Sequence, residues 1–223
     1  MKFIRNIVSA GMMVSLVLVL VFTVIDVAVL QDRAFFAAQY EKNQVSQVVQ
    51  VSSEDLMRIT DQLLGYMKGE KEELQLDVTV RGSERPFFSQ RELDHMVDVR
   101  QMVLGAMWVR RVAVVLLLAF LLFPKNRRTF CKTVVFGLPV FLLLLGVLAL
   151  VASRDFTTFW WYFHVLFFSN ELWILDPAVD LLVNIVPEPF FAACAIRVGI
   201  GVVLGIFALW GICFWRYRIQ KRV

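Results

Sequence analysis

The sequence predicts a mainly α-helical integral membrane protein, with four transmembrane helices and a small extracytoplasmic α+β cap. The chain has 223 residues, of which 59% are hydrophobic, and its mean hydropathy is +0.68, far above that of a soluble domain. Its apolar residues form four blocks that are long enough to cross a bilayer. The basic residues lie in short clusters beside these blocks, which is typical of topology signals and not of a nucleic-acid-binding surface.

The first apolar block assigns residues 1–30 to the first span. Arg5 precedes the block and no small-residue cleavage site follows it, so we expect an uncleaved transmembrane helix. The one charge inside the block, Asp26, lies about 20 residues after Arg5. This separation is roughly 30 Å of helix, which places Asp26 near the far membrane interface.

Residues 31–100 are mixed and charged, and we expect them to form the cap. A helix should begin after Ser52, carry an apolar stripe and end at Gly69. From Leu74 to Val80 apolar and polar residues alternate, which predicts a strand. The turn residues Arg81-Gly82-Ser83 follow, so we expect at least one short hairpin.

The second span, residues 101–124, contains Arg110 and Arg111. Only about 12 residues separate Arg111 from Pro124, so the pair lies roughly 18 Å from the cytoplasmic end, within the hydrocarbon. Charges at this depth usually face the protein interior or water. Two interpretations remain open: a polar cavity that holds a lipid head group or ester, or an ion pair with Asp26 combined with snorkelling.

The distribution of charge predicts the topology. A basic cytoplasmic loop, 125–133, precedes the third span, 134–152. An extracytoplasmic aromatic loop, 153–190, then leads to the fourth span, 191–215, and to a basic tail, 216–223. Residues 31–100 carry 9 basic and 13 acidic side chains, and residues 153–190 carry one basic and five acidic side chains. The positive-inside rule therefore places both termini in the cytoplasm and these two segments outside.

One predicted helix start holds His95, one of only two histidines in the chain. Ser89 followed by Glu92 is a capping box, so a helix should begin at Gln90 and continue past Arg111. On this helix Glu92 and Asp98 each share a face with His95. A carboxylate beside an imidazole holds one tautomer and favours the protonated form. The alternative is a solvated helix start with a chance histidine.

The extracytoplasmic aromatic loop holds the second histidine, His164. Eight of the 13 residues from Phe156 to Phe168 are aromatic. An aromatic belt at the membrane interface is one explanation, although a belt spaces a few aromatic residues along helix ends. A loop this apolar must lie on the bilayer or fold into the cap. In both cases His164 comes to the same interface as His95.

Two histidines at one membrane surface indicate paired acid–base chemistry, because neutral imidazole accepts a proton and imidazolium donates one. No serine lies in a nucleophile-elbow pattern. Cys194 is a minor nucleophile candidate, with Arg197 as its only nearby basic residue. Metal-ligand spacings such as His-x-x-x-His are also lacking, so we expect no metal and no other cofactor.

Together these segments resemble the bacterial lipoprotein intramolecular transacylases. The resemblance rests on Phe88-x-x-Arg91-Glu92-x-x-His95-Met96-x-Asp98-Val99, and on Phe163-His164 followed by Phe167, Asn170, Trp173, Asp176-Pro177, Asp180 and Pro187-Glu188. It includes the four spans with an extracytoplasmic cap, and so extends over nearly the whole chain. The resemblance implies that His95 and His164 are the catalytic pair.

The resemblance also implies the reaction. The sn-2 acyl chain of a diacylglyceryl-modified lipoprotein moves to the α-amine of its N-terminal cysteine, giving a lyso-form lipoprotein. The expected location is the bacterial cytoplasmic membrane, with the active site at the extracytoplasmic surface. The expected partners are this lipoprotein and membrane lipid, with no nucleic acid, and we expect a monomer. A membrane hydrolase that uses the same histidines and a non-catalytic membrane partner protein are the alternatives.

Several other side chains are candidates for orienting groups or binding substrate. They are Arg91, Glu92, Asp98, Arg110, Arg111, Trp160, Tyr162, Phe163, Asn170, Trp173, Asp176, Asp180 and Arg197. Asp98 is the first choice to orient His95, with Glu92 an equal geometric rival. The sequence does not assign the base, the acid or the oxyanion donor. We expect the two imidazoles within about 10 Å of each other, because one compact transition state must contact both.

Overall fold

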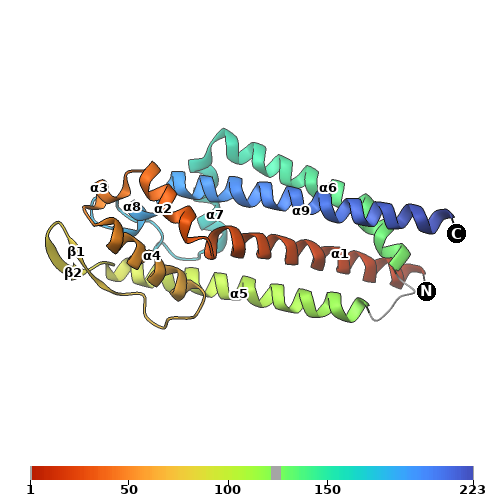
Figure 1. Ribbon diagram of the computed structural model, residues 1–223, viewed down its shortest axis with the longest axis horizontal. Helices are drawn as coiled ribbons and strands as arrows, with labels where there is room; N and C mark the ends of the chain where they lie inside the picture. The colour runs from red at the N-terminus through yellow and green to blue at the C-terminus, as the bar shows by residue number, and fades with distance from the viewer. Residues whose placement is uncertain (1, 122–126, 223) are drawn as a thin grey trace. The chain divides into compact units, whose positions relative to one another are not determined.

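The computed structural model describes residues 2–121 and 127–222, and Figure 1 labels its elements. In chain order these are α1 Lys2–Ile25, the π-helix η1 Asp26–Leu30, α2 Arg33–Lys42, α3 Val45–Val49, α4 Ser53–Met67, β1 Asp77–Val80, β2 Ser83–Pro86, α5 Gln90–Leu121, α6 Arg127–Arg154, α7 Phe156–Phe167, α8 Leu182–Ile185 and α9 Glu188–Arg222. Four of these helical segments are long and apolar enough to cross a membrane. The predicted fold class is confirmed.

The chain forms two compact units. The membrane unit comprises Met1–Ile25, Ala106–Arg154 and Arg197–Val223. The cap unit comprises Asp26–Gly105 and Asp155–Ile196. Both histidines therefore belong to the cap unit, and the site can be described within that unit alone.

Packing in the membrane unit depends on close contact between helices. Val134, Leu138 and Ile206 are fully buried in its apolar core. A Cβ at Gly205 of α9 would lie 2.4 Å from the side chain of Leu20 on α1. Glycine is needed there because close helix packing in membranes depends on small residues at the contact.

Helices α6 and α9 are longer than the apolar blocks that predicted them. Helix α6 begins at Arg127, so most of the basic loop predicted at 125–133 is helical. This boundary of the prediction was wrong because arginine and lysine are good helix formers and nothing after Arg127 stops a helix. Residues 125 and 126 of that loop, and Pro124, lie outside the described residues.

Helix α4 of the cap unit is the helix expected after Ser52. The Oγ of Ser52 accepts a hydrogen bond from the backbone N–H of Asp55 at 3.0 Å. Leu56 and Ile59 are fully buried. Gly69 follows the helix at a φ of 76°, a left-handed conformation that favours glycine. The predicted helix and its end are confirmed.

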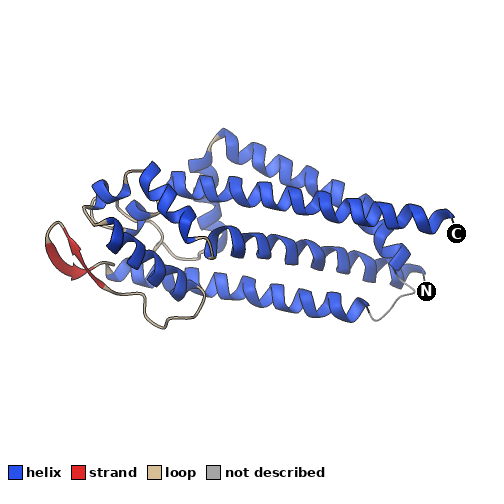
Figure 2. Ribbon diagram, viewed as in Figure 1, coloured by secondary structure: helices blue, strands red, loops and turns tan. Residues whose placement is uncertain are grey.

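The predicted hairpin is present, and Figure 2 shows its two strands in red. Strand β1 pairs antiparallel with β2, and the turn residues Arg81 and Gly82 both have positive φ. Two such residues form the turn type that matches strand twist. The strand starts at Asp77 and not at Leu74, because Gln75 uses its side chain to bind the backbone N–H and C=O of Phe88 at 3.1 and 2.7 Å.

Helix α7 lies within the segment that we interpreted as a loop. Asp155 caps it, since its Oδ1 accepts from the backbone N–H of Thr158 at 3.0 Å. Trp160 stacks on Phe163, and Phe163 contacts Phe167, at ring-centroid distances of 5.0 and 4.8 Å. The loop interpretation is wrong for this stretch, because it used the aromatic content and overlooked the helical spacing of the rings.

Candidate active site

The start of α5 fixes the position of His95. The Oγ of Ser89 accepts from the backbone N–H of Glu92 at 3.3 Å, and a carboxylate oxygen of Glu92 accepts from the backbone N–H of Ser89 at 2.6 Å. This is the predicted capping box, and α5 begins at Gln90 as expected. His95 lies in the second turn of the helix and is 7% exposed.

Glu92 also ties α5 to a distant part of the chain. Its second carboxylate oxygen accepts from the backbone N–H of Leu182, and the side chain is only 1% exposed. The hydroxyl of Ser89 donates to Asp180 at 2.9 Å, and Asp180 accepts from the backbone N–H of Asp176 at 2.9 Å. Glu92 and Asp180 therefore hold the 176–182 turn against α5. The oxygens of Glu92 are engaged by backbone groups and not by an imidazole.

His164 lies on α7 with its ring orientation set by its own helix. Its Nδ1 lies 2.8 Å from the backbone carbonyl of Trp160. A carbonyl can only accept, so Nδ1 carries the proton and Nε2 carries the lone pair in the neutral ring. Burial lowers the pKa of His164, and the hydrogen bond to Trp160 offsets this only in part. The ring is therefore a neutral base at neutral pH, with Nε2 as its basic atom.

The two imidazoles lie side by side. Their ring centroids are 6.2 Å apart and their planes are inclined by 37°. The expected separation of less than about 10 Å is confirmed. Phe168 contacts both rings, at 5.1 Å from His95 and 5.6 Å from His164. The Nδ1 of His95 is buried and has no hydrogen-bond partner in the described part of the chain, so it is an unsatisfied polar atom beside His164.

Aromatic rings surround the ring of His164. Trp173 stacks on it at 4.8 Å, and Trp160 meets it edge-on at 4.6 Å. Phe163 contacts His164 at 5.6 Å, and Phe191 stacks on Trp160 at 4.2 Å. These rings form an apolar wall beside the basic nitrogen. Such a wall excludes water and suits hydrocarbon chains.

Two side-chain hydrogen bonds join α5 to the loop after α7, and a third orders the loop itself. Asn170 donates to Asp98 at 2.8 Å, and the indole N–H of Trp173 donates to the backbone carbonyl of Asn170 at 2.8 Å. Arg91 donates to the backbone carbonyl of Glu171 at 2.6 Å. Asp98 thus holds the loop that carries Trp173 and does not bind Nδ1 of His95.

The other predicted residues are dispersed. Tyr162 is 61% exposed and contacts Trp161 on the outer side of α7. Arg110, Arg111 and Arg197 belong to the membrane unit, and the cavity and ion-pair interpretations of the arginine pair remain predictions.

Sequence reasoning missed Phe191, which stacks on Trp160, and two further members of the site. Phe168 touches both histidines, and its position four residues after His164 was a usable signal. Leu182 contributes only a backbone N–H, so no property of its side chain could have indicated it. In the described ranges, no three His, Cys, Asp or Glu residues are grouped so as to hold a metal ion.

The sequence model described as "Lipoprotein intramolecular transacylase Lit" matches residues 10–191. The in meso structure of the membrane integral lipoprotein intramolecular transacylase Lit from Bacillus cereus is similar, with 16% sequence identity and a TM-score of 0.74. The match covers 100% of this chain and 99% of that chain. A variant of that protein with one histidine replaced by alanine gives 16% identity, a TM-score of 0.74 and coverages of 100% and 97%.

A variant with one histidine replaced by arginine gives 19% identity, a TM-score of 0.70 and coverages of 99% and 94%. No curated protein sequence matches the chain. At these identities the solved structures show a shared fold.

Proposed function

Because the chain belongs to the lipoprotein intramolecular transacylase family, whose model matches residues 10–191, we propose that His164 and His95 catalyse its acyl transfer. The family makes the protein a membrane-integral acyltransferase that acts on a lipoprotein. In our proposal the substrate carries a diacylglyceryl group on its N-terminal cysteine. The sn-2 acyl chain moves to the α-amine of that cysteine and leaves a lyso-form lipoprotein.

The observation that carries this proposal is the pair of imidazoles 6.2 Å apart with different hydrogen-bonding states. His164 has a fixed tautomer with a basic Nε2, which suits removal of a proton from the attacking amine. His95 has a buried nitrogen without a partner, which suits a hydrogen bond to the developing oxyanion. Two positive charges at this distance in apolar surroundings would repel, so the two rings should not both be charged. The proposed roles need at most one charged ring at a time.

The proposed steps balance with one shuttling proton. The amine attacks the ester carbonyl, the C–N bond forms, and Nε2 of His164 takes the amine proton. When the tetrahedral intermediate collapses, the C–O bond to glycerol breaks and the His164 imidazolium returns the proton to the glyceryl oxygen. No covalent enzyme intermediate is needed, because the amine and the ester belong to one molecule. Both histidines are neutral again at the end.

The aromatic wall supports transfer in preference to hydrolysis. Trp160 and Trp173 cover two sides of the His164 ring and make its surroundings apolar. Exclusion of water matters because water would compete with the amine for the same ester. The same rings provide apolar surface for the acyl chains.

The charge pattern supports the proposed orientation. The predicted extracytoplasmic segments contain an excess of acidic residues, whereas the predicted cytoplasmic ends of the spans are basic. By the positive-inside rule, this pattern favours cytoplasmic termini and histidines at the outer surface of a bacterial cytoplasmic membrane. A monomer is sufficient for this chemistry, because both histidines come from one chain. Membrane lipid surrounds the spans.

Mass spectrometry of a lipoprotein N-terminus tests the function. Purified protein is incubated with a diacylglyceryl lipoprotein whose sn-2 chain is isotopically labelled, in the presence of excess unlabelled phospholipid. We expect the label to appear on the cysteine nitrogen of the same molecule. Release of labelled free fatty acid would instead establish a hydrolase, and unchanged substrate would indicate a non-catalytic role.

A further inference from the structure

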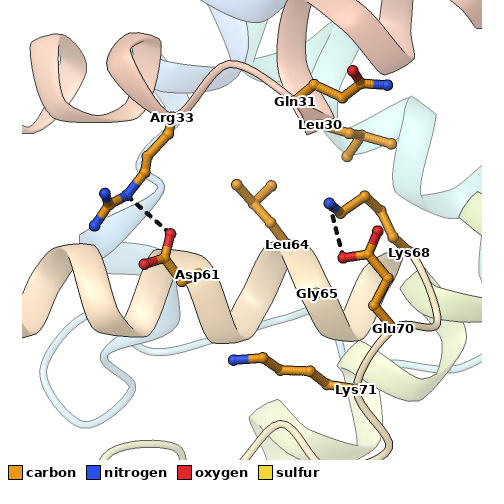
Figure 3. Close-up of a pocket in the computed structure, with 9 residues that line it drawn as sticks. All are labelled: Leu30, Gln31, Arg33, Asp61, Leu64, Gly65, Lys68, Glu70 and Lys71. Atoms are coloured by element: carbon orange, nitrogen blue, oxygen red, sulfur yellow. Dashed lines mark ion pairs between the residues drawn. The ribbon is translucent and has the colours of Figure 1, made fainter.

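A polar cavity of about 640 Å³ lies in the cap unit, apart from the histidines (Figure 3). It lies among the end of η1, the start of α2, helix α4 and the loop that follows α4. Three cationic side chains line it, Arg33, Lys68 and Lys71, together with the carboxylates of Asp61 and Glu70. The lining thus carries one net positive charge. None of the residues proposed to take part in acyl transfer belongs to it.

Two of the three cations are each paired with a carboxylate of their own. Arg33 pairs with Asp61 at 2.9 Å and Lys68 pairs with Glu70 at 3.0 Å, as the dashed lines in Figure 3 show. Both pairs are partly exposed, and exposed pairs contribute little, so either cation can bind a second anion at small cost. The ammonium of Lys71 donates instead to the neutral side chain of Gln62 at 2.7 Å, and the ion pairs of the described residues give it no carboxylate partner.

The ammonium of Lys71 is partly ordered before any ligand binds, through two exposed hydrogen bonds that involve Gln62. The side-chain amide of Gln62 also donates to the backbone carbonyl of Glu73 at 2.6 Å, which fixes the oxygen that Lys71 contacts. A Cβ at Gly65 would lie 3.0 Å from the stem of Lys71, so the bare helix surface at Gly65 gives that stem its room. A fixed charge loses less conformational entropy when a ligand binds.

The cavity starts where the first candidate span ends. That span is Phe3–Leu30, and both Leu30 and the next residue, Gln31, line the cavity. Residues at the end of a span lie at the level of the lipid head groups. Leu30 and Leu64 add apolar surface beside the charges, as Figure 3 shows.

We propose that this cavity binds the phosphodiester head group of a bilayer phospholipid. A phosphodiester carries one negative charge, which balances the net charge of the lining. An ammonium group is a common phosphate ligand that acts as a point charge, and hydrogen bonds between charged groups are the strong ones. The lipid binds the cap unit at the head-group level. This site is independent of the proposed acyl transfer, and neither depends on the other.

Native mass spectrometry of the full chain, released from detergent with phosphatidylglycerol or with diacylglycerol, tests the proposal. Lys71→Gln removes the unneutralised charge. Lys42→Gln is the matched control, because Lys42 is exposed at the end of α2 and does not line the cavity. We expect phosphatidylglycerol to bind Lys71→Gln about five- to tenfold more weakly than the wild type or the control. Diacylglycerol should bind all three proteins equally. Equal phosphatidylglycerol binding by all three would overturn the proposal.

Two further measurements separate the lipid from other ligands. If millimolar inorganic phosphate displaced the lipid completely, the cavity would be a free-phosphate site and the lipid assignment would be wrong. Tighter binding of an acidic peptide than of phosphatidylglycerol would overturn it as well. Gly65→Ala keeps every charge but displaces the stem of Lys71, and we expect weaker lipid binding there too. This variant provides the test if Lys71→Gln does not fold.

Discussion

The segments around His95 and His164 bring the same type of side chain to one site by different means. Around His95, the helix is fixed by a capping box and by a carboxylate that reaches 90 residues along the chain, while the buried imidazole nitrogen is left without a partner. Around His164, the ring is fixed directly, by the carbonyl of Trp160 and by stacking on Trp173. The hydrogen bonds thus fix the backbone in the His95 segment, whereas they fix the imidazole ring itself in the His164 segment.

This difference supports the different roles that we propose for the two histidines. A ring with a fixed tautomer presents one defined basic atom, which a proton acceptor needs. A ring whose buried nitrogen lacks a hydrogen-bond partner can form that bond with a substrate atom.

The largest expected effect comes from removing either ring. His164→Ala and His95→Ala should each lower the turnover number by about 10²–10⁴-fold, and the double variant should lose much less than the product of the two. If His95 only donates a hydrogen bond, His95→Gln should keep more activity than His95→Ala, whereas His164→Gln should be as inactive as His164→Ala. Mass spectrometry of the lipoprotein product measures each rate.

The exposed valines Val97 and Val165 provide matched controls on the same two helices. Val97→Ala and Val165→Ala should leave turnover within about twofold of the wild type. Near-normal turnover in a well-folded histidine variant would remove that residue from the mechanism. Equal rescue by glutamine at both positions would show that the two rings do the same task.

The next effect concerns stability. Glu92→Ala should lower the free energy of unfolding by about 2–5 kcal/mol, because the backbone N–H groups of Ser89 and Leu182 both lose their acceptor. Thermal unfolding in detergent measures the change. Asp94→Ala removes only an exposed hydrogen bond to Gln90, and should change stability by less than about 0.5 kcal/mol. Equal effects would mean that the carboxylate does not hold this segment.

A smaller effect should follow from loosening the loop that carries Trp173. Asp98→Ala removes the acceptor for Asn170 and should lower the turnover number about three- to tenfold, with little change in KM. Asp98→Asn keeps an oxygen acceptor and should restore most of the activity. If Asp98→Asn is as impaired as Asp98→Ala, the negative charge and not the loop contact is what the site requires.

The pH dependence of stability should reflect both imidazoles, because burial lowers the pKa of His164 and lowers the pKa of His95 to about 4. Burial lowers the pKa of His164 below its ordinary value of about 6.5, so the unfolded chain binds a proton that the folded chain excludes as the pH falls through that value. The midpoint temperature of thermal unfolding should therefore decrease as the pH is lowered from about 7 to about 5. In His164→Gln the fall should be smaller. An identical fall in both proteins would contradict the lowered pKa.

The smallest expected effect is none. EDTA or phenanthroline should not inhibit acyl transfer, because no metal-ligand spacing occurs in the sequence. Inhibition that added zinc reverses would contradict the proposed metal-free mechanism. A metal-assisted mechanism would then replace the one proposed.

Local signals in the sequence were sufficient for some parts of the site. Ser89 and Glu92 predicted the start of α5 because a capping box uses neighbouring residues, and Ser52 and Gly69 predicted α4 in the same way. The closeness of the two histidines followed from placing both at one membrane interface. In each case the evidence lay within a few residues or in the pattern of apolar blocks.

Contacts over long sequence distances were not predictable. The bond from Leu182 to Glu92 uses a backbone donor, which any residue would supply. The bond from Asn170 to Asp98 joins two residues that were both candidates, but nothing in the sequence paired them. Helix α7 was missed for a different reason: the prediction used the aromatic composition of the segment and not the helical spacing of its rings.

The hydrogen bond from His164 to Trp160 spans a single turn of α7. Both partners belong to the same helix, so this hydrogen bond is kept when the helix moves as a rigid unit. Motions on the microsecond to millisecond timescale that part α7 from α5 would change the distance between the two rings but not the nitrogen that carries the proton. In the proposed mechanism, entry of a two-chain substrate that parted these helices would therefore leave the basic atom of His164 unchanged.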